Sequence, residues 1–113
     1  LTLLTFIVAC QTIERKALNS VDKSTTEASE YMREWKMYCS TNLVFPGTHM
    51  SVRTRYEALQ KSISEVEMKA ISYKSGVVPL EVLSLAVTDL SNKRNELRDV
   101  IKFYIQKPSP EKP

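Results

Sequence analysis

The side chains that most often carry chemistry are few in this chain of 113 residues. There is one histidine, His49, and there are two cysteines, Cys10 and Cys39. A zinc site takes three or four ligands, so Cys39 and His49 could supply at most half of one. His49 has no nucleophile motif near it, and two glycines are too few for a phosphate-binding loop. We therefore expect no enzyme, no metal site and no cofactor.

The charges of the chain give no sign of a nucleic-acid or substrate site. The 16 basic and 13 acidic residues leave a formal net charge of +3, and both signs are spread along the sequence. A nucleic-acid surface needs clustered lysines and arginines. Carboxylate pairs such as Glu65 and Glu67 fall on polar helix faces, where a solvated role is commoner than catalysis. We expect neither a nucleic-acid partner nor a small-molecule substrate.

Cys10 stands at the end of an apolar run. Seven of the first nine residues are apolar and none is charged. The run ends in a pattern that resembles the lipobox of bacterial lipoproteins: Ile7, Val8, Ala9 and Cys10. The resemblance implies that residues 1–9 are the remnant of a signal peptide, and that Cys10 becomes the lipidated first residue of the mature protein. Gln11 stands where an aspartate tends to mark inner-membrane retention, which favours the periplasmic face of the outer membrane.

Two other interpretations of residues 1–10 remain open. They could form an ordinary buried helix end, or the stub of a plain secretory signal that is cut after Cys10. As a helix they are too short to span a bilayer, which takes about 20 residues. In either alternative the protein carries no lipid.

Apolar or small residues recur at alternating three and four positions in three segments. This is the period of a helix seam, the stripe along which one helix packs on another. The first seam comprises Leu18, Val21, Thr25, Ala28, Met32, Trp35 and Cys39. The second comprises Val52, Tyr56, Leu59, Ile63, Val66, Ala70 and Tyr73. The third comprises Leu80, Leu83, Val87, Leu90, Arg94, Leu97, Ile101 and Tyr104.

Turn residues separate the three segments. Pro46 and Gly47 form a turn pair that should end the first helix and lie in a loop. Ser51 is the expected N-cap of the second helix, and Gly76 its left-handed C-terminal residue. Pro79 suits the first turn of the third helix, where its missing N–H costs nothing. That helix should end just before the prolines of residues 108–113.

The three seams match one another when the chain folds back twice. The second and third pair Ile63 with Leu90, and the first and second pair Cys39 with Val52. This predicts an all-α fold, an antiparallel up-down-up three-helix bundle over residues 24–107 with a disordered proline-rich tail at 108–113. The anchor cysteine and a polar lead-in occupy residues 10–23. A long two-helix hairpin that dimerises would use the same seams and is the structural alternative.

Two features of the seams could belong either to the hydrophobic core or to a binding site. Tyr31, Trp35 and Tyr38 share one helical face, which could be part of the core or a groove for a partner peptide. Arg94 is the one charged residue in a seam. It could extend its stem out to solvent, meet a carboxylate such as Glu30, or form a polar layer that fixes the register.

The expected partner-binding residues lie at one end of the bundle. They are Leu43, Val44, Phe45 and Phe103. The seven seam layers do not use them, and exposed apolar clusters usually mark contacts. The rival interpretation is a plug, in which a loop over residues 42–50 folds down and buries Phe45 against Phe103.

The function that best fits these expectations is a small lipid-anchored adaptor that binds or escorts another envelope protein. Residues 31–39, followed by a loop proline at Pro46, loosely resemble the first helix of secretin pilotins. That resemblance implies an anchor cysteine, a flexible stretch and a helical domain that binds a peptide of a secretion-channel subunit. A phage outer-membrane spanin subunit has a similar layout. The alternative function is a structural coiled-coil subunit of a cytosolic or phage assembly, without lipid.

Overall fold

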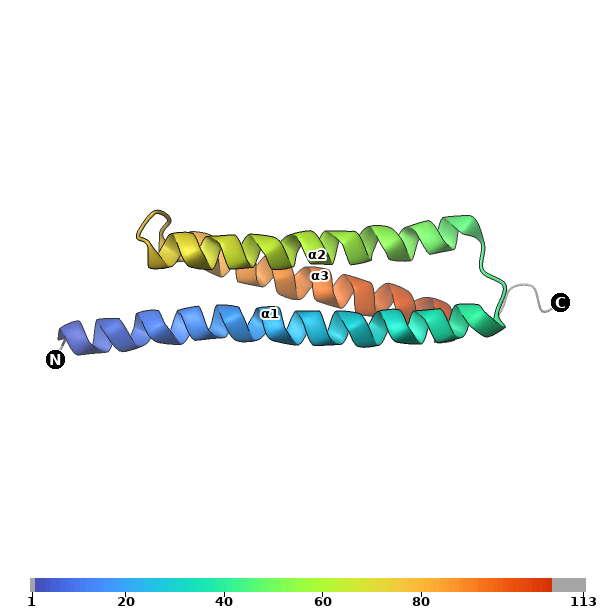
Figure 1. The fold of residues 1–113 in the computed structure, drawn as a ribbon, viewed down its shortest axis with the longest axis horizontal. Helices are drawn as coiled ribbons and strands as arrows, with labels where there is room; N and C mark the ends of the chain where they lie inside the picture. The colour runs from blue at the N-terminus through green and yellow to red at the C-terminus, as the bar shows by residue number, and fades with distance from the viewer. Residues whose placement is uncertain (1, 107–113) are drawn as a thin grey trace.

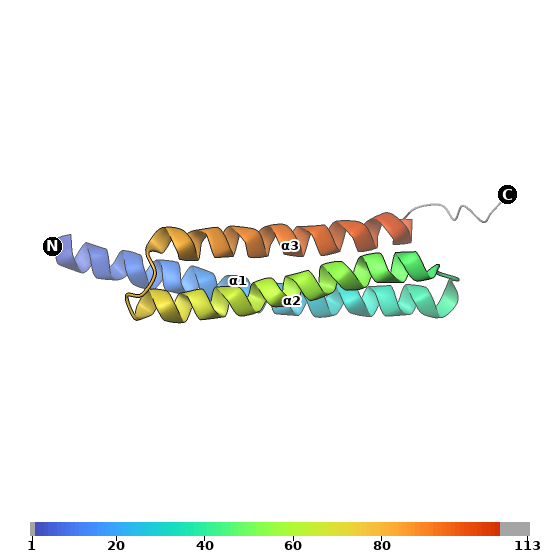
Figure 2. The same ribbon diagram turned by 90° about the horizontal axis from the view of Figure 1, so that it is seen from above.

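The chain folds into three long helices that run up, down and up (Figure 1). The computed structural model describes the backbone of residues 2–106 and the side chains of residues 13–106. The helices are α1 (Thr2–Thr41), α2 (Pro46–Lys74) and α3 (Leu80–Gln106), and each contacts the other two. They form a rod of 68 × 21 × 18 Å, which Figure 2 shows from a second side. The predicted all-α three-helix bundle is confirmed, while the predicted tail at residues 108–113 lies outside the described residues.

The first helix is longer than expected. α1 is unbroken from Thr2 to Thr41, so residues 10–23 continue the helix and are not a separate lead-in. Ala17 and Val21 are buried in the same core as the later seam residues, so packing begins before the expected start at residue 24. Lys74, the last residue of α2, pairs with Glu14 at 3.8 Å. The part of α1 before Glu14 therefore extends beyond the α2–α3 hairpin, as both ribbon views show.

Two positions in the N-terminal half of the α1 seam lie one residue earlier than expected. Leu18 and Thr25 are exposed, whereas Ala17 and Ser24 are fully buried. The sequence pattern favoured the leucine because it is more apolar. Ala17, Val21, Ser24 and Ala28 instead form the buried stripe, at spacings of four, three and four residues. Three seam positions are as expected: Val21, Ala28 and Trp35.

A short connection, residues 42–45, joins α1 to α2. Pro46 is in the first turn of α2, where its missing N–H has no intrahelical acceptor to lose and its fixed φ suits a helix. The expected Pro46-Gly47 turn and the expected N-cap at Ser51 are therefore wrong, and the N-cap is Phe45. At the end of α1, the Asn42 side chain donates a hydrogen bond to the Tyr38 carbonyl at 2.9 Å and closes the helix.

The turn between α2 and α3 is the one that the sequence predicts. Gly76 has a φ of 77°, in the left-handed region. Its N–H donates to the Tyr73 carbonyl at 3.0 Å, and the Val77 N–H donates to the Ser72 carbonyl at 2.8 Å. These two bonds satisfy carbonyls that the end of a helix leaves open. α3 then begins at Leu80, directly after Pro79.

The helices α1 and α2 pair about one helical turn away from the expected register. The matched seams place Cys39 opposite Val52, but its sulfur lies 4.0 Å from the His49 ring, three residues earlier on α2. The Glu14–Lys74 pair is displaced by the same three residues. Because a seam repeats at every turn, its period cannot distinguish registers that differ by one turn. The short connection, which begins α2 at Pro46, decides between them.

The core is a single stripe along the axis of the rod. Between α2 and α3, the Ser62 hydroxyl donates to the Asp89 carboxylate at 3.0 Å, at the level expected for the Ile63–Leu90 layer. The side chains that are fully buried or nearly so are Ala17, Val21, Ser24, Ala28, Trp35, Val52, Leu59, Ser62, Val66, Ala70, Leu83, Leu90, Leu97 and Ile101.

Candidate functional site

The end of the bundle where α1 turns into α2 gathers rings from all three helices. The Trp35 ring centroid lies 6.0 Å from that of His49 on α2 and 6.1 Å from that of Tyr104 on α3. Tyr38 stacks on Trp35 at 5.6 Å, and Phe103 meets Tyr104 edge-on at 5.3 Å. Such ring pairs stabilise beyond the area that they bury. Trp35 is buried, so it belongs to the core and does not line an open groove.

Large apolar side chains surround these rings and remain exposed. Leu43 is 88% exposed, Phe45 57% and Phe103 55%, and Met50 on the first turns of α2 is exposed as well. We call these four residues the end face: Leu43, Phe45, Met50 and Phe103. Val44 is different, because it is partly buried and packs against the core.

The structure thus brings the expected partner-binding residues to one end, with Val44 turned inward. Phe45 and Phe103 each keep more than half of their surface, so the connection does not bury them as a plug. Sequence reasoning missed Met50, because it placed residues 42–50 in a loop. With Pro46 taken as the first residue of α2, Met50 falls on a helix, outside the seam that contains Val52 and Leu59.

Phe45 stands at a position where a helix favours a different residue. It is the N-cap of α2, its backbone is extended at φ −68° and ψ 148°, and its side chain forms no capping hydrogen bond. Serine, threonine, aspartate or asparagine at an N-cap stabilises a helix by about 1 kcal/mol relative to a residue that cannot cap. The Phe45 ring therefore contributes no cap to α2, and most of it contributes nothing to the core.

Cys39 and His49 lie close together at this end. The Cys39 thiol is free, and its sulfur lies 4.0 Å from His49 Nδ1. Burial raises the pKa of the Cys39 thiol, which keeps it protonated at neutral pH. Among the residues with described side chains, no group of three or more metal-ligating side chains comes together. His49 is exposed and lies on α2, not in a loop over residues 42–50.

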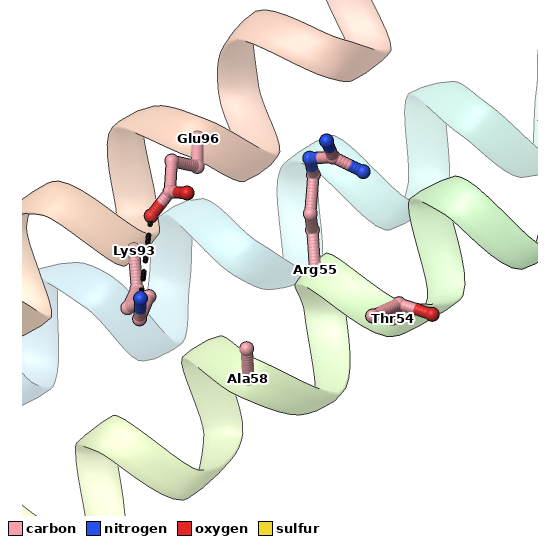
Figure 3. A pocket seen from close by; sticks show the side chains of 5 residues that line it. All are labelled: Thr54, Arg55, Ala58, Lys93 and Glu96. Carbon is pink, nitrogen blue, oxygen red and sulfur yellow. Dashed lines mark ion pairs between the residues drawn. The ribbon is translucent and has the colours of Figure 1, made fainter.

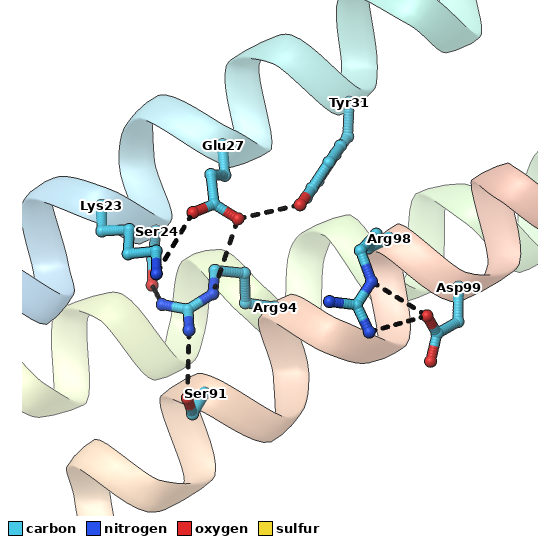
Figure 4. Close-up of polar contacts among 8 residues, drawn as sticks. All are labelled: Lys23, Ser24, Glu27, Tyr31, Ser91, Arg94, Arg98 and Asp99. Carbon is cyan, nitrogen blue, oxygen red and sulfur yellow. Dashed lines mark hydrogen bonds and ion pairs between the residues drawn. The ribbon is translucent and has the colours of Figure 1, made fainter.

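A second cluster lies halfway along the bundle, around Arg94 (Figure 4). The Arg94 side chain is only 12% exposed. Its guanidinium donates to the hydroxyls of Ser24 and Ser91, at 3.1 Å each, and lies 3.8 Å from the Glu27 carboxylate. The expected alternatives for Arg94 included a polar layer and a carboxylate partner, and both occur. The carboxylate is that of Glu27 on α1, one turn before the expected Glu30. We call this cluster the polar layer: Ser24, Glu27, Tyr31, Ser91 and Arg94.

The polar layer also contains a tyrosine with a shifted pKa. The Tyr31 hydroxyl donates to the Glu27 carboxylate at 2.8 Å. Burial, together with the hydrogen bond and the negative charge of Glu27, raises the pKa of Tyr31 to about 12. Throughout the part of the chain whose side chains are described, no buried side-chain polar atom lacks a hydrogen-bond partner. The polar layer is thus closed to a ligand, because its groups satisfy one another.

A shallow groove of about 260 Å³ lies between α2 and α3 (Figure 3). Its charged groups already have partners. Lys93 pairs with Glu96 at 3.6 Å, and Arg55 donates to the Ser51 hydroxyl at 2.7 Å. Thr54 and Ala58 complete the lining. The charged side chains of this groove therefore bond to neighbouring residues of the chain.

The predicted lipidation site lies at the other end of the rod. Cys10 precedes Glu14, so it is on the part of α1 that extends beyond the hairpin. From Cys10 to Thr41 the helix rises about 47 Å at 1.5 Å per residue. None of the described helices is long and apolar enough to cross a membrane.

No family model, curated protein or solved structure matches this chain. The case for a function therefore depends on the sequence and the geometry alone.

Proposed function

We propose that this chain is a small lipid-anchored helical adaptor that binds another protein of the bacterial envelope through its end face. The observation that carries the proposal is Phe45. An exposed phenylalanine at an N-cap neither caps the helix nor buries most of its ring. Residues that break local preferences in this way concentrate at functional sites. Exposed aromatic and aliphatic groups over a rigid base are also what protein partners use as anchors.

The positions of Cys10 and the end face fit an adaptor. A lipid on Cys10 would hold one end of the rod at the membrane, and the end face lies at the other end (Figure 1). The unbroken α1 joins the two without a flexible segment. This differs from the layout that the resemblance to secretin pilotins implies, in which a flexible stretch follows the anchor. The partner would therefore be held at a fixed distance from the membrane.

The binding claim is tested by removing the Phe45 ring. Phe45→Ser should abolish recovery of the envelope partner after cross-linking in cells. Val77→Ser is the matched control, because Val77 is 75% exposed and lies in the turn at the opposite end of the bundle. Equal recovery of the partner with both variants would show that the end face does not bind it.

The anchor claim is tested by mass spectrometry of the processed protein. A diacylated Cys10 at the mature N-terminus is the expected result, and Cys10→Ser should release the protein from the membrane. The second candidate function is a structural coiled-coil subunit without lipid. The extension of α1 beyond the hairpin favours it, since a bare helix end can pair with another helix. Residues 1–9 still attached, with no lipid on Cys10, would select this candidate.

A further inference from the structure

We propose that the segment bound by the end face is an acidic amphipathic helix. This inference rests on the proposed function and adds the chemistry of the partner. It is carried by the charges that surround the four apolar residues of the end face.

The stretches that form this end carry basic residues and no acidic ones. Residues 35–56 contain no aspartate or glutamate, and neither do residues 100–106 of α3. The basic residues of these stretches are Lys36, Arg53, Arg55 and Lys102. Lys36 and Lys102 are exposed and form no ion pair among the described side chains. Exposed apolar anchors on stretches that also carry two unpaired lysines are complementary to an apolar stripe flanked by carboxylates.

Of the acidic residues that border this end, Glu34 is exposed and has no ion pair among the described side chains, and the other two are paired. Glu57 pairs with Arg53 at 3.5 Å, and Asp99 pairs with Arg98 at 3.0 Å. The first turn of α2 has no acidic residue, and its N-cap side chain forms no hydrogen bond. The N-terminus of α2 brings one positive dipole end to this surface, but α1 and α3 end there and bring two negative ones, so the helix dipoles do not add to the positive charge of the lysines.

The geometry favours a helix as the bound segment. The described part of the chain contains no strand, so it has no sheet edge to which a peptide strand could add. The end face is built from the ends of helices and one short connection. An amphipathic helix meets such a surface with anchors spaced at three and four residues.

A bilayer of anionic lipid would also attract the lysines and the exposed apolar residues of this end. The geometry disfavours such a bilayer as the target. Cys10 and the end of α1 are separated by about 47 Å of continuous helix. A lipid on Cys10 would therefore hold the far end away from the membrane in which it is anchored. A protein is then more accessible to the apolar residues of the end face than that bilayer is.

Two synthetic helical peptides of about 18 residues, or five turns, test the inference with the full chain. Both carry the same leucine stripe, and they differ only in having glutamates or lysines on the flanks. The glutamate peptide should bind at least about tenfold more tightly, as measured by fluorescence anisotropy. Lys36→Glu combined with Lys102→Glu should remove that preference, and Phe45→Ser should weaken both peptides. Lys16→Glu combined with Lys61→Glu is the charge-matched control, since both lysines are exposed and lie outside the end stretches.

The outcomes separate the inference from the proposed function. Equal or tighter binding of the lysine peptide would overturn the acidic partner, while Phe45-dependent binding of both peptides would leave the adaptor standing. If neither peptide binds but the partner still cross-links in cells, the inference is wrong and the proposed function holds. Binding to phosphatidylglycerol vesicles that requires Lys36 and Phe45, with no peptide binding, would reject both in favour of a lipid surface.

Discussion

The polar layer and the end face place polar and apolar groups in opposite ways. In the polar layer, Arg94 is almost buried, yet its nitrogens contact hydroxyls and a carboxylate. In the end face, Leu43 is almost fully exposed and Phe45 is more than half exposed. A buried polar group costs free energy unless it is paired, and an exposed apolar group stabilises nothing until something covers it. The first region is complete within the fold, and the second is not.

The contacts of the polar layer help to determine how the helices pack. Ser24 on α1 and Arg94 on α3 can bond only when these two helices lie together in one register. The same holds for Ser62 on α2 and Asp89 on α3. Such contacts specify one arrangement among seams that repeat at every turn. The four residues of the end face do not determine the register of the helices. We propose that they serve a partner instead.

The largest effect should come from the core between the two regions. Leu90 is fully buried, so Leu90→Ala should lower the free energy of unfolding by about 2–5 kcal/mol. Leu85→Ala is the control on the same helix, because Leu85 is exposed, and it should cost less than about 0.5 kcal/mol. Urea denaturation followed by circular dichroism measures both. Similar losses for the two variants would contradict the observed packing of α3.

Breaking the polar layer should have the next largest effect. Arg94→Ala leaves Ser24 and Glu27 without their shared partner, at a cost of about 1–3 kcal/mol. Glu27→Gln in the same chain should recover part of the loss, because it removes a partly buried carboxylate that has lost one of its two basic partners and keeps only the exposed Lys23. Arg98→Ala is the control, since Arg98 is half exposed and pairs only with its neighbour Asp99. If Arg98→Ala costs as much as Arg94→Ala, the polar layer does not contribute as described.

The polar layer should also make stability depend on high pH. The pKa of Tyr31 rises from its ordinary value of 10.0 to about 12 in the folded chain. The folded state therefore holds the phenol proton more tightly than the unfolded state. The resulting stabilisation is complete below pH 10 and is lost as the pH rises through about 12. Tyr31→Phe should lose less stability over this range in thermal melts, and a parallel decline for both proteins would show that Tyr31 is not responsible.

The smallest effect on stability should come from the end face. Phe45→Ser loses the partial burial of the ring, but it places a capping hydroxyl at the start of α2. Each effect is about 1 kcal/mol and they oppose each other, so the melting temperature should change by only a few degrees. Phe45→Ala removes the ring without adding a cap and should be the less stable of the two. A large loss with Phe45→Ser would mean that the ring serves the fold after all.

The period of the apolar residues was enough to predict three helices, their direction and most of the core. Leu59, Leu83, Leu90 and Leu97 are buried where the seams place them, because large apolar groups leave few alternatives. The glycine at position 76 was equally predictable, since it supplies the positive φ that closes α2.

The details that the sequence did not predict depend on which helix face is buried and on how the helices are connected. Ala17, and not Leu18, is in the core, because it shares a helix face with Val21 and Ser24. Pro46 could end one helix or begin the next, and the tertiary arrangement settled the choice. The Glu27 partner of Arg94 could not be separated from Glu30, since both lie within reach on neighbouring turns. In the end face, the positions of Leu43, Phe45 and Phe103 were predicted, whereas Met50 required the correct start of α2.

Photo-cross-linking in living cells tests the central claim most directly. A photoreactive residue at Leu43, the most exposed member of the end face, is compared with one at Val77 in the turn at the opposite end. We expect one discrete cross-linked envelope protein from position 43, and none from position 77. That product should disappear in the Phe45→Ser background. The same product from both positions, or a product from position 77 alone, would contradict the assignment of partner binding to the end face.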